Sequence, residues 1–384
     1  MTRKAFIQQC AAAGMASMLS PAALSAFGAP AKKIRIGLIG CGSVSGMYLP
    51  HLSKSPYVEL VSTCDIKPDR AEKAAAKYKL AHWYPNIEQM LAGAPFDLLV
   101  NLTDMQEHGR LNKIALNAGK NVWSEKPMAN TYREGRALLD MAIQKGLRIW
   151  GAPAVVNSPQ FAFMARAVQE GKIGRPAAAH AHYGHLGPTW SAFFYEKGGG
   201  SMPDLGVYNF GTLTGILGPV KSVVAMTNIL TPNRTVDDKG NILVAAEDNA
   251  MVLMEHHNGA LSHVQCGFNY FDPYGHGGDG QDKPTISLVG TKGSMHLIGY
   301  DWKPFGVDLA TVEDEKGKRF SVDPGTYVWE QGASVIAESM ATGQEPLIAA
   351  EHALHVLEII EAARKSQATG RRVQLKSKFK WPVV

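Results

Sequence analysis

The sequence predicts an α/β Rossmann domain with a parallel sheet, followed by an α+β domain whose open sheet is mostly antiparallel. From residue 33 to about residue 153, short β-rich runs alternate with amphipathic helical stretches, which is typical of a parallel sheet. A glycine-rich turn follows the first of these runs. Beyond residue 154, strand-like runs are separated by turns such as HNGA and GTKG, which suit antiparallel hairpins.

The individual elements follow from the same periodicities. In the first domain we expect strands over 34–40, 58–65, 96–103, 121–125 and 148–152, and helices over 69–79, 106–118 and 131–145. We expect the second domain to span residues 154–375. It begins with a helix over 159–170, and strands follow over 177–185, 220–229, 248–256, 259–268, 285–290 and 293–298. Helices over 329–342 and 349–369 are expected near the end of the chain.

Composition excludes several classes of function. The 384 residues carry a net charge of +5 without a block of like charges, which argues against nucleic-acid or polybasic membrane binding. After residue 30 no apolar stretch reaches the ~18 residues of a membrane span. Beyond that point only Cys41, Cys64 and Cys266 remain, and their spacing suits neither a metal site nor a disulfide framework. We therefore expect no metal, no nucleic acid and no membrane partner.

The first thirty residues resemble an export signal. Basic Arg3 and Lys4 precede an apolar run over 11–19, and Pro21 and small residues follow. The start is similar to a twin-arginine signal in which Lys4 replaces the second arginine. We expect an exported, periplasmic protein; the alternative is a flexible or helical N-terminal extension.

The turn after the first strand, residues 40–46, has the context of a dinucleotide-binding site. Gly40 permits a tight turn and Gly42 lets the backbone approach a pyrophosphate, while Ser43 and Val44 open a helix whose N–H groups face the phosphates. The third glycine, Gly46, stands one position later than in GxGxxG, so a purely structural turn is the alternative.

Asp65 ends the second strand, 19 residues beyond Gly46. A carboxylate there accepts hydrogen bonds from the ribose hydroxyls and repels a 2′-phosphate, which favours NAD over NADP. Lys67 and Arg70 lie nearby and weaken that preference.

A lysine follows a later strand, in the segment Glu125-Lys126-Pro127. Ligands collect at the carboxyl ends of strands in open parallel sheets, so Lys126 can supply an ammonium to a substrate hydroxyl or to a catalytic neighbour. By itself the segment is equally compatible with a surface lysine.

Four segments together resemble the Gfo/Idh/MocA (glucose-fructose oxidoreductase/inositol dehydrogenase) family. AGKNVWSEKPMA resembles the AGKHVxxEKP segment, and residues 198–208 resemble GGGxLxDxGxH/Y. Thr103 and His108 fall in a loop that usually reads TPxxxH, and GTKGSM resembles GTxGxL. The resemblance implies an NAD(P)-dependent oxidoreductase that transfers a hydride between nicotinamide and a carbinol of a sugar, glycoside or polyol.

The resemblance also implies which residues act. Lys126, Asp204 and Tyr208 would surround the nicotinamide and the substrate, and Thr103, His108 and Glu125 would lie with the cofactor. A nearby ammonium favours a phenolate, so we expect Lys126 to lower the pKa of Tyr208 and to form an acid–base pair with it. Asp204 would orient the lysine or accept from a substrate hydroxyl.

Some positions depart from the family pattern. Asp104 replaces the usual proline after Thr103, and Asn157 and its neighbours replace an arginine that many members carry at the start of the second domain. The missing arginine makes an acidic sugar substrate less expected.

Further substrate contacts are expected in the second domain, and surface polar residues are the alternative. The candidates are Asn157, His182, His185, Trp190 and His276, the last in a glycine-rich loop over 272–279. The histidines and aspartates there would also permit a metal, but their spacing matches no known ligand pattern.

Two other functions remain open: a redox-neutral glycosidase or lyase that oxidises a sugar carbon transiently, and a cofactor-binding protein without catalysis. The presence of Lys126, Asp204 and Tyr208 argues against the second. An exported enzyme would retain NAD(H) tightly, which suggests either sugar–sugar transhydrogenation or redox-neutral cleavage. We also expect a homo-oligomer formed through the sheet of the second domain.

Overall fold

The computed structural model describes residues 32–272 and 282–384, and residues 33–384 form one compact unit. The expected export signal and His276 lie outside the described residues. The expected domain boundary at residues 153 and 154 stays a prediction. Among the described helices, none is both long and apolar enough to cross a membrane.

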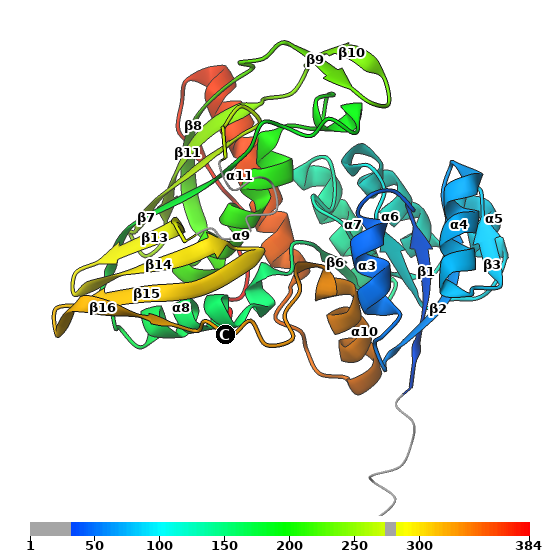
Figure 1. Cartoon of the computed structure of the whole chain (residues 1–384), viewed down its shortest axis with the longest axis horizontal. Coiled ribbons are helices and arrows are strands. Elements are labelled where there is room, and N and C mark those ends of the chain that lie inside the picture. Colours follow the sequence, from blue (N-terminus) through cyan, green and yellow to red (C-terminus); the bar gives the residue numbers. More distant parts are fainter. Residues whose placement is uncertain (1–31, 273–281) are drawn as a thin grey trace, which may run out of the picture. The chain divides into compact units, whose positions relative to one another are not determined.

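The first domain contains a six-stranded parallel sheet in the order β3-β2-β1-β4-β5-β6. Its strands are β1 (Ile34–Ile39), β2 (Val58–Cys64), β3 (His82–Tyr84), β4 (Leu98–Asn101), β5 (Asn121–Ser124) and β6 (Ile149–Gly151). Between them run α3 (Ser45–Leu52), α4 (Pro68–Tyr78), α5 (Ile87–Ala92), α6 (His108–Asn117) and α7 (Tyr132–Gln144) (Figure 1). The strand order reverses between β1 and β4, where such sheets open a ligand crevice at their carboxyl edge. The predicted Rossmann fold is confirmed.

Local sequence signals set several of these elements. The β4 strand is buried on both faces, as expected of a central parallel strand. The side chain of Thr131 caps α7 by accepting from the Glu134 N–H at 3.1 Å. The short strand β3 and helix α5 were not predicted; the side chain of Asn86 caps α5 by accepting from the Gln89 N–H at 2.9 Å.

The second domain is built on a nine-stranded sheet in the order β16-β15-β14-β13-β7-β12-β11-β8-β17. Its strands are β7 (Pro176–Gly184), β8 (Val220–Asn228), β11 (Asn249–His256), β12 (Leu261–Gly267), β13 (Pro284–Gly290), β14 (Gly293–Tyr300), β15 (Lys303–Thr311), β16 (Asp314–Phe320) and β17 (Val373–Gln374). Among these described strands β7 and β12 pair in parallel and the other neighbours are antiparallel, which confirms the mostly antiparallel sheet. A separate hairpin joins β9 (Asn233–Val236) to β10 (Gly240–Leu243).

Helices cover one face of this sheet. They are α8 (Pro159–Gln169), α9 (Val207–Leu217) and α11 (Ala350–Thr369) (Figure 1). A π-helical turn over Met202–Gly206 leads directly into α9, and neither was predicted from the sequence. The helix α10 (Gly332–Thr342) returns to the first domain and packs against α3, β1, β2 and β5.

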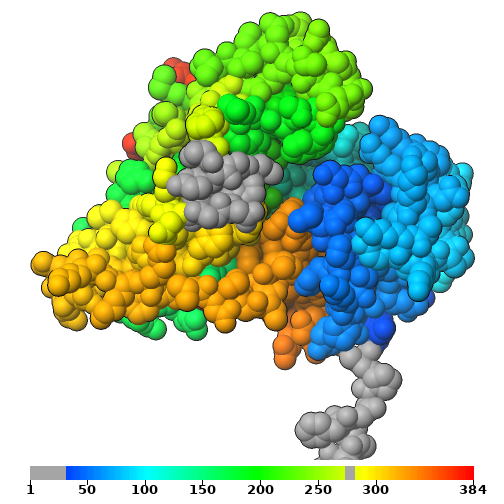
Figure 2. All heavy atoms as spheres, viewed as in Figure 1, coloured from blue at the N-terminus to red at the C-terminus, as the bar shows by residue number. Residues whose placement is uncertain are grey.

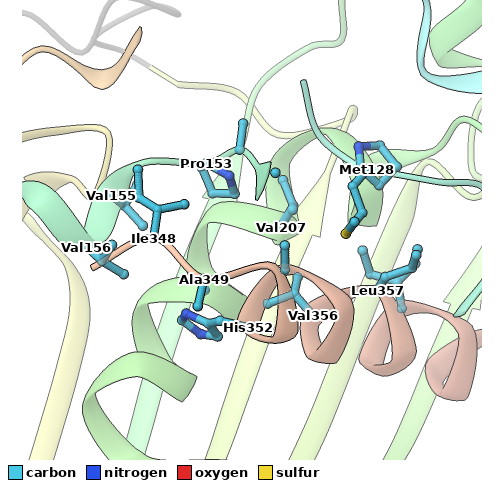
Figure 3. A pocket seen from close by; sticks show the side chains of 16 residues that line it. Met128, Pro153, Val155, Val156, Val207, Ile348, Ala349, His352, Val356 and Leu357 are labelled. Carbon is cyan, nitrogen blue, oxygen red and sulfur yellow. The ribbon is translucent and has the colours of Figure 1, made fainter. Parts of the chain in front are cut away.

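An apolar pocket lies where α11 passes the loops that follow β5 and β6 (Figure 3). Met128, Val155, Val207, Ile348 and Val356 are among its lining side chains, and Figure 3 shows them around the helix. Such a lining offers little for a polar ligand to bond. The pocket is therefore a packing space between α11 and these loops.

Candidate active site

The glycine turn at the carboxyl end of β1 fits a dinucleotide. Gly40 has φ +90°, and a Cβ at this position would lie 2.5 Å from the carbonyl carbon of Leu102. Above Gly42 the space is open: within 4 Å a Cβ would meet only the Arg70 side chain, at 3.7 Å. Among the described residues, neither the Ser43 nor the Val44 N–H has a hydrogen-bond acceptor. Free N–H groups at the start of α3 beside open space suit a bound pyrophosphate.

Asp65 braces the same turn. It is buried at the end of β2, and its two carboxylate oxygens accept from the N–H groups of Cys41 and Lys67, each at 2.8 Å. A carboxylate oxygen can accept more than one hydrogen bond, so either oxygen of Asp65 can still accept from a ribose hydroxyl. Asp65 therefore has a structural task in addition to the one the sequence predicted.

We expect Asp65→Asn to weaken the discrimination against NADP(H). Asparagine keeps one acceptor for the turn but removes the charge, and one like-charge repulsion near a protein surface is worth about 1 to 4 kcal/mol. NADP(H) affinity should therefore rise about tenfold or more relative to NAD(H), measured by fluorescence titration with both cofactors.

Asp69→Asn is the matched control, because Asp69 is exposed on α4 and pairs with Lys73 at 3.2 Å. A wild type that binds NADP(H) at least as tightly as NAD(H) would contradict the assignment of Asp65.

His108 supports the loop after β4 from behind. Its side chain is buried, with Nδ1 2.8 Å from the Pro127 carbonyl oxygen and Nε2 2.8 Å from that of Thr103. Both ring nitrogens are thus engaged with the main chain. His108 therefore connects the Thr103 loop to the Glu125-Lys126-Pro127 segment, and its direct contact with the cofactor stays a prediction.

The main feature of the site is an ion pair between the two domains. Lys126, just after β5, places Nζ 2.7 Å from Asp204 Oδ1 and 2.8 Å from the Asp204 main-chain oxygen. Both side chains are about nine-tenths buried. Asp204 lies in the π-helical turn before α9, and such turns are frequent at functional sites. The sequence motifs therefore place together two residues 78 positions apart.

Glu125 lies on the inner side of Lys126. It is buried, accepts from the Tyr48 hydroxyl at 2.6 Å and from the Lys126 N–H at 2.8 Å. Trp123 in turn donates to the Tyr48 oxygen at 3.3 Å. Glu125 is therefore held by α3 and β5, and it fixes the backbone from which Lys126 projects.

Tyr208 lies next to this ion pair, but its protonation differs from expectation. The Lys126 ammonium sits over the Tyr208 ring, 5.2 Å from its centre, and its charge is paired with Asp204. Burial, with a smaller effect from the carboxylate of Glu125, raises the pKa of Tyr208 well above its ordinary value. The expectation that Lys126 lowers this pKa is therefore wrong, because burial outweighs a charge that is already neutralised.

An aromatic wall that the sequence reasoning missed extends from Tyr208 into the second sheet. The ring of Tyr183 lies 6.2 Å from that of Tyr208 and 4.6 Å from that of Tyr300, and Trp302 stacks on Tyr300 at 5.4 Å. The predicted contact His185 joins this wall, with its ring 6.1 Å from that of Tyr183. Period-two alternation along β7 could have found Tyr183 from its inward-facing neighbours Ala179 and Ala181.

The other predicted substrate contacts are distributed differently. His182 is exposed on the face of β7 opposite to Tyr183, because successive strand residues point to opposite faces, and its contact with the substrate stays a prediction. Trp190 is exposed beside Phe194, with ring centres 5.4 Å apart. Asn157 has a buried Nδ2 without a hydrogen-bond partner in the described chain, and it precedes α8. In the parts that the structure describes, no three metal-ligating side chains gather at one point.

The strand order, and the glycine turn at the point where that order reverses, define a dinucleotide-binding Rossmann domain. Residues 34–152 match a family profile described as an oxidoreductase family with an NAD-binding Rossmann fold. Residues 161–296 match a profile described as the GFO/IDH/MocA C-terminal domain. The chain therefore belongs to the Gfo/Idh/MocA family, and the family, the NAD cofactor and the enzyme class predicted from the sequence are confirmed.

Similar proteins extend over almost the whole chain. D-apiose dehydrogenase of Paraburkholderia graminis is 22% identical over 366 residues, covering 92% of this chain and 93% of the relative. The NAD(+)-dependent scyllo-inositol 2-dehydrogenase of Bacillus subtilis is 24% identical, covering 89% and 96%. An aldose–aldose oxidoreductase from Caulobacter crescentus, solved with glycerol, superposes with a TM-score of 0.76 at 18% identity over 90% of this chain and 100% of that one.

Proposed function

We propose that the protein is an NAD(H)-dependent dehydrogenase or reductase of a neutral sugar or polyol, in which Lys126 and Tyr208 bind and protonate the reacting oxygen. The main observation in support of this proposal is the buried Lys126–Asp204 pair at the carboxyl edge of the NAD-binding sheet. The named activities of the similar proteins favour this function over redox-neutral cleavage.

Lys126 would bind the substrate oxygen directly. A lysine ammonium has three N–H donors, and Asp204 accepts two of them through its carboxylate and its main-chain oxygen. The third donor is left for the substrate. Asp204 thereby fixes the direction of the ammonium, which is the orienting role that the sequence suggested for it.

Tyr208 would supply the proton. Its hydroxyl has no hydrogen-bond partner among the described residues, and its raised pKa keeps it protonated at neutral pH. When NAD(H) is bound, the cofactor gives or takes the hydride. In reduction, the Tyr208 O–H breaks and its proton goes to the substrate oxygen; in oxidation the proton returns to the Tyr208 oxygen. A protonated Tyr208 suits the reductive direction at neutral pH.

The walls of the site support a neutral substrate. The buried rings of Tyr183 and Tyr300 pack on each other and on Trp302 behind Tyr208, so the site is apolar on this side. The ammonium of Lys126 is already paired with Asp204, so it brings no unpaired charge for a carboxylate. Together with the missing arginine near Asn157, this favours sugars and polyols over sugar acids.

We also propose that NAD(H) is retained tightly, as the expected export of the protein would require. Two segments of the second domain support this: residues 186–197 and the β9–β10 hairpin, stapled by hydrogen bonds from Ser191 and Ala192 to Asp238 at 2.6 and 2.9 Å. Gln106 of the first domain donates to the Phe193 carbonyl at 2.8 Å, so residues 186–197 are also bound to the first domain. Figure 2 shows a recess between the blue surface around α3 and the green surface of these segments.

The test uses mature protein purified without added cofactor. After denaturation we expect about one nucleotide per chain, and the native protein should exchange hydride between two sugars without free NAD. A panel of neutral sugars, polyols, glycosides and sugar acids then identifies the substrate. An empty protein that turns over readily with external NAD would contradict retention. A panel in which only glycosides react, without net redox, would contradict the dehydrogenase.

We further propose that a second copy of the chain covers the open face of the second sheet. Met226 and Leu253 on neighbouring strands are 77% and 57% exposed, and Met251 pairs directly with Met226. Contiguous exposed apolar side chains of this kind mark protein–protein contacts. The expected oligomer would therefore form here.

We expect the double variant Met226→Lys with Leu253→Lys to change the oligomer into a monomer, as measured by light scattering, because the added charges would be buried in the interface. Val312→Lys, at a 66% exposed apolar position in the β15–β16 turn, is the control. An unchanged mass in the double variant would remove this face as the interface.

A further inference from the structure

Two side chains from distant parts of the second domain hold the glycine-rich loop that carries Asp204. Arg364, on α11, donates from Nη2 to the main-chain oxygen of Gly199 at 2.7 Å. Glu247, just before β11, accepts the Ser201 N–H through its main-chain oxygen at 2.9 Å. Its carboxylate Oε1 lies 3.3 Å from the Met202 nitrogen, which donates to it. The loop is therefore fixed from outside itself.

Glu247 takes the place of a local helix cap. The first N–H groups of a helix lack partners within the helix, and a carboxylate near them is favourable. Ser201 stands at the cap position of the π-helical turn, but its hydroxyl makes no cap hydrogen bond and instead lies 3.5 Å from the Cys266 main-chain oxygen. The carboxylate of Glu247 is therefore the cap of the turn that contains Asp204.

The fit between Glu247 and the loop is close. Gly200 has φ +114°, and a Cβ there would lie 2.3 Å from Glu247 Oε1. Burial raises the pKa of Glu247, and the guanidinium of Arg364, with Nη2 3.3 Å from Oε2, opposes that rise. Arg364 thus supports the charge of the cap and also binds the loop directly.

We infer that Glu247 and Arg364 are positioning residues for the Lys126–Asp204 pair. The Asp204 N–H donates to the Gly200 oxygen at 3.3 Å, so a shift of Gly200 would carry Asp204 with it. Lys126 would then lose both of its acceptors at once, because both belong to Asp204. This inference rests on the proposed function for its effect on turnover, but not for its effect on Lys126 itself.

Glu247 and Arg364 are accessible from outside the active site. Glu247 and Arg364 line an open groove together with Asn130, Lys197 and Asn228, and the Arg364 side chain is 35% exposed. A small cation can therefore reach the position of a truncated Arg364 from solvent. This geometry allows chemical rescue by ethylguanidinium.

The test compares Glu247→Gln, Glu247→Ala, Arg364→Lys and Arg364→Ala. We expect kcat to fall about tenfold to a hundredfold in the two alanine variants with little change in KM, because an ångström of misplacement costs up to about a hundredfold. Glu247→Gln, which keeps an acceptor for Met202, and Arg364→Lys should lose less. Ethylguanidinium should restore part of the activity of Arg364→Ala. Arg372→Ala is the control. Arg372 pairs with Glu255 at 3.3 Å, the same distance as in the Arg364–Glu247 pair, but this pair does not contact the glycine-rich loop.

A second readout does not depend on activity. Labelling of Lys126 by an amine reagent, followed by mass spectrometry, should be slow in the wild type and faster in both alanine variants while their melting temperatures show that they remain folded. Unchanged labelling and unchanged kcat in folded variants would overturn the inference even if the enzyme oxidises sugars. Faster labelling in a protein that acts on no sugar would sustain the inference and reject the proposed function. If an alanine variant does not fold, Arg364→Gln, which removes the charge that supports Glu247 but keeps a polar side chain, takes its place. Wild-type kcat and wild-type labelling of Lys126 in a folded Arg364→Gln protein would likewise overturn the inference.

Discussion

Replacing Lys126 by alanine or Tyr208 by phenylalanine is expected to lower turnover by about 10² to 10⁴, the usual effect of removing an acid–base group. Lys126→Ala removes the ammonium that Asp204 orients. Tyr208→Phe removes only the hydroxyl, so ring packing against Tyr183 and NAD(H) affinity should survive. Steady-state kinetics on the substrate from the sugar panel, with NAD(H) affinity by fluorescence, measure both effects.

The pH dependence of kcat/KM tests the protonation of Tyr208. Because burial raises the pKa of Tyr208 well above its ordinary value, Tyr208 stays protonated through neutral pH and should contribute no ionisation there. The profile of kcat/KM against pH should therefore keep its neutral-range transitions in Tyr208→Phe. Tyr270→Phe, which loses a 2.6 Å hydrogen bond to Asn249, controls for a lost hydroxyl elsewhere. Near-normal turnover in Tyr208→Phe would remove Tyr208 from the mechanism.

Two glycine substitutions in the cofactor turn should fail for different reasons. Gly40→Ala forces a left-handed φ on alanine and places its Cβ 2.5 Å from the Leu102 backbone, so we expect both a lower melting temperature and lost NAD(H) binding. Gly42→Ala meets only the Arg70 side chain at 3.7 Å, so the fold should be intact. Its methyl group nevertheless occupies the space where the pyrophosphate approaches, and NAD(H) affinity should fall about tenfold or more.

Gly46→Ala is the control for both, since nothing lies within 4 Å of a Cβ at that position. Thermal unfolding with and without NAD(H) measures stability and binding in one experiment. A Gly42→Ala protein that binds NAD(H) like the wild type would place the pyrophosphate elsewhere and contradict the cofactor site.

The sequence was most informative where period and chemistry agree. Five of the six parallel strands, and β7, β8 and β11 to β14 of the second sheet, were predicted because their apolar runs are short, β-rich and bounded by turn residues. The described strands β3, β9, β10, β15, β16 and β17 were not predicted. The helix α9 was missed because it is buried all round and carries Gly211, Gly215 and threonines, so it shows neither an apolar stripe nor good helix formers. Its helical state comes from burial against β7 and α11.

The site followed the same division. The motifs correctly predicted that Lys126, Asp204 and Tyr208 lie together. Lys126 directly follows a recognisable strand, and Asp204 and Tyr208 belong to a recognisable glycine-rich motif. The predicted pKa shift of Tyr208 was wrong because it depends on burial and on the partner that neutralises Lys126, and both are set by packing. Glu247 and Arg364 gave no sequence signal, since their contacts with Met202 and Gly199 join residues 45 and 165 positions apart.

The return of α10 to the first domain makes the order of synthesis matter. Ala333, Ile336 and Ala337 of α10 share one core with Ile36 of β1, and Ser334 lies 2.7 Å from His51 on α3. One face of the parallel sheet is therefore completed by residues that leave the ribosome after nearly nine-tenths of the chain. Contacts of such long sequence separation form late and slowly. In a nascent chain that ends before residue 329 that face of the sheet is covered only in part, so the cofactor domain cannot reach its final stability before translation is almost finished.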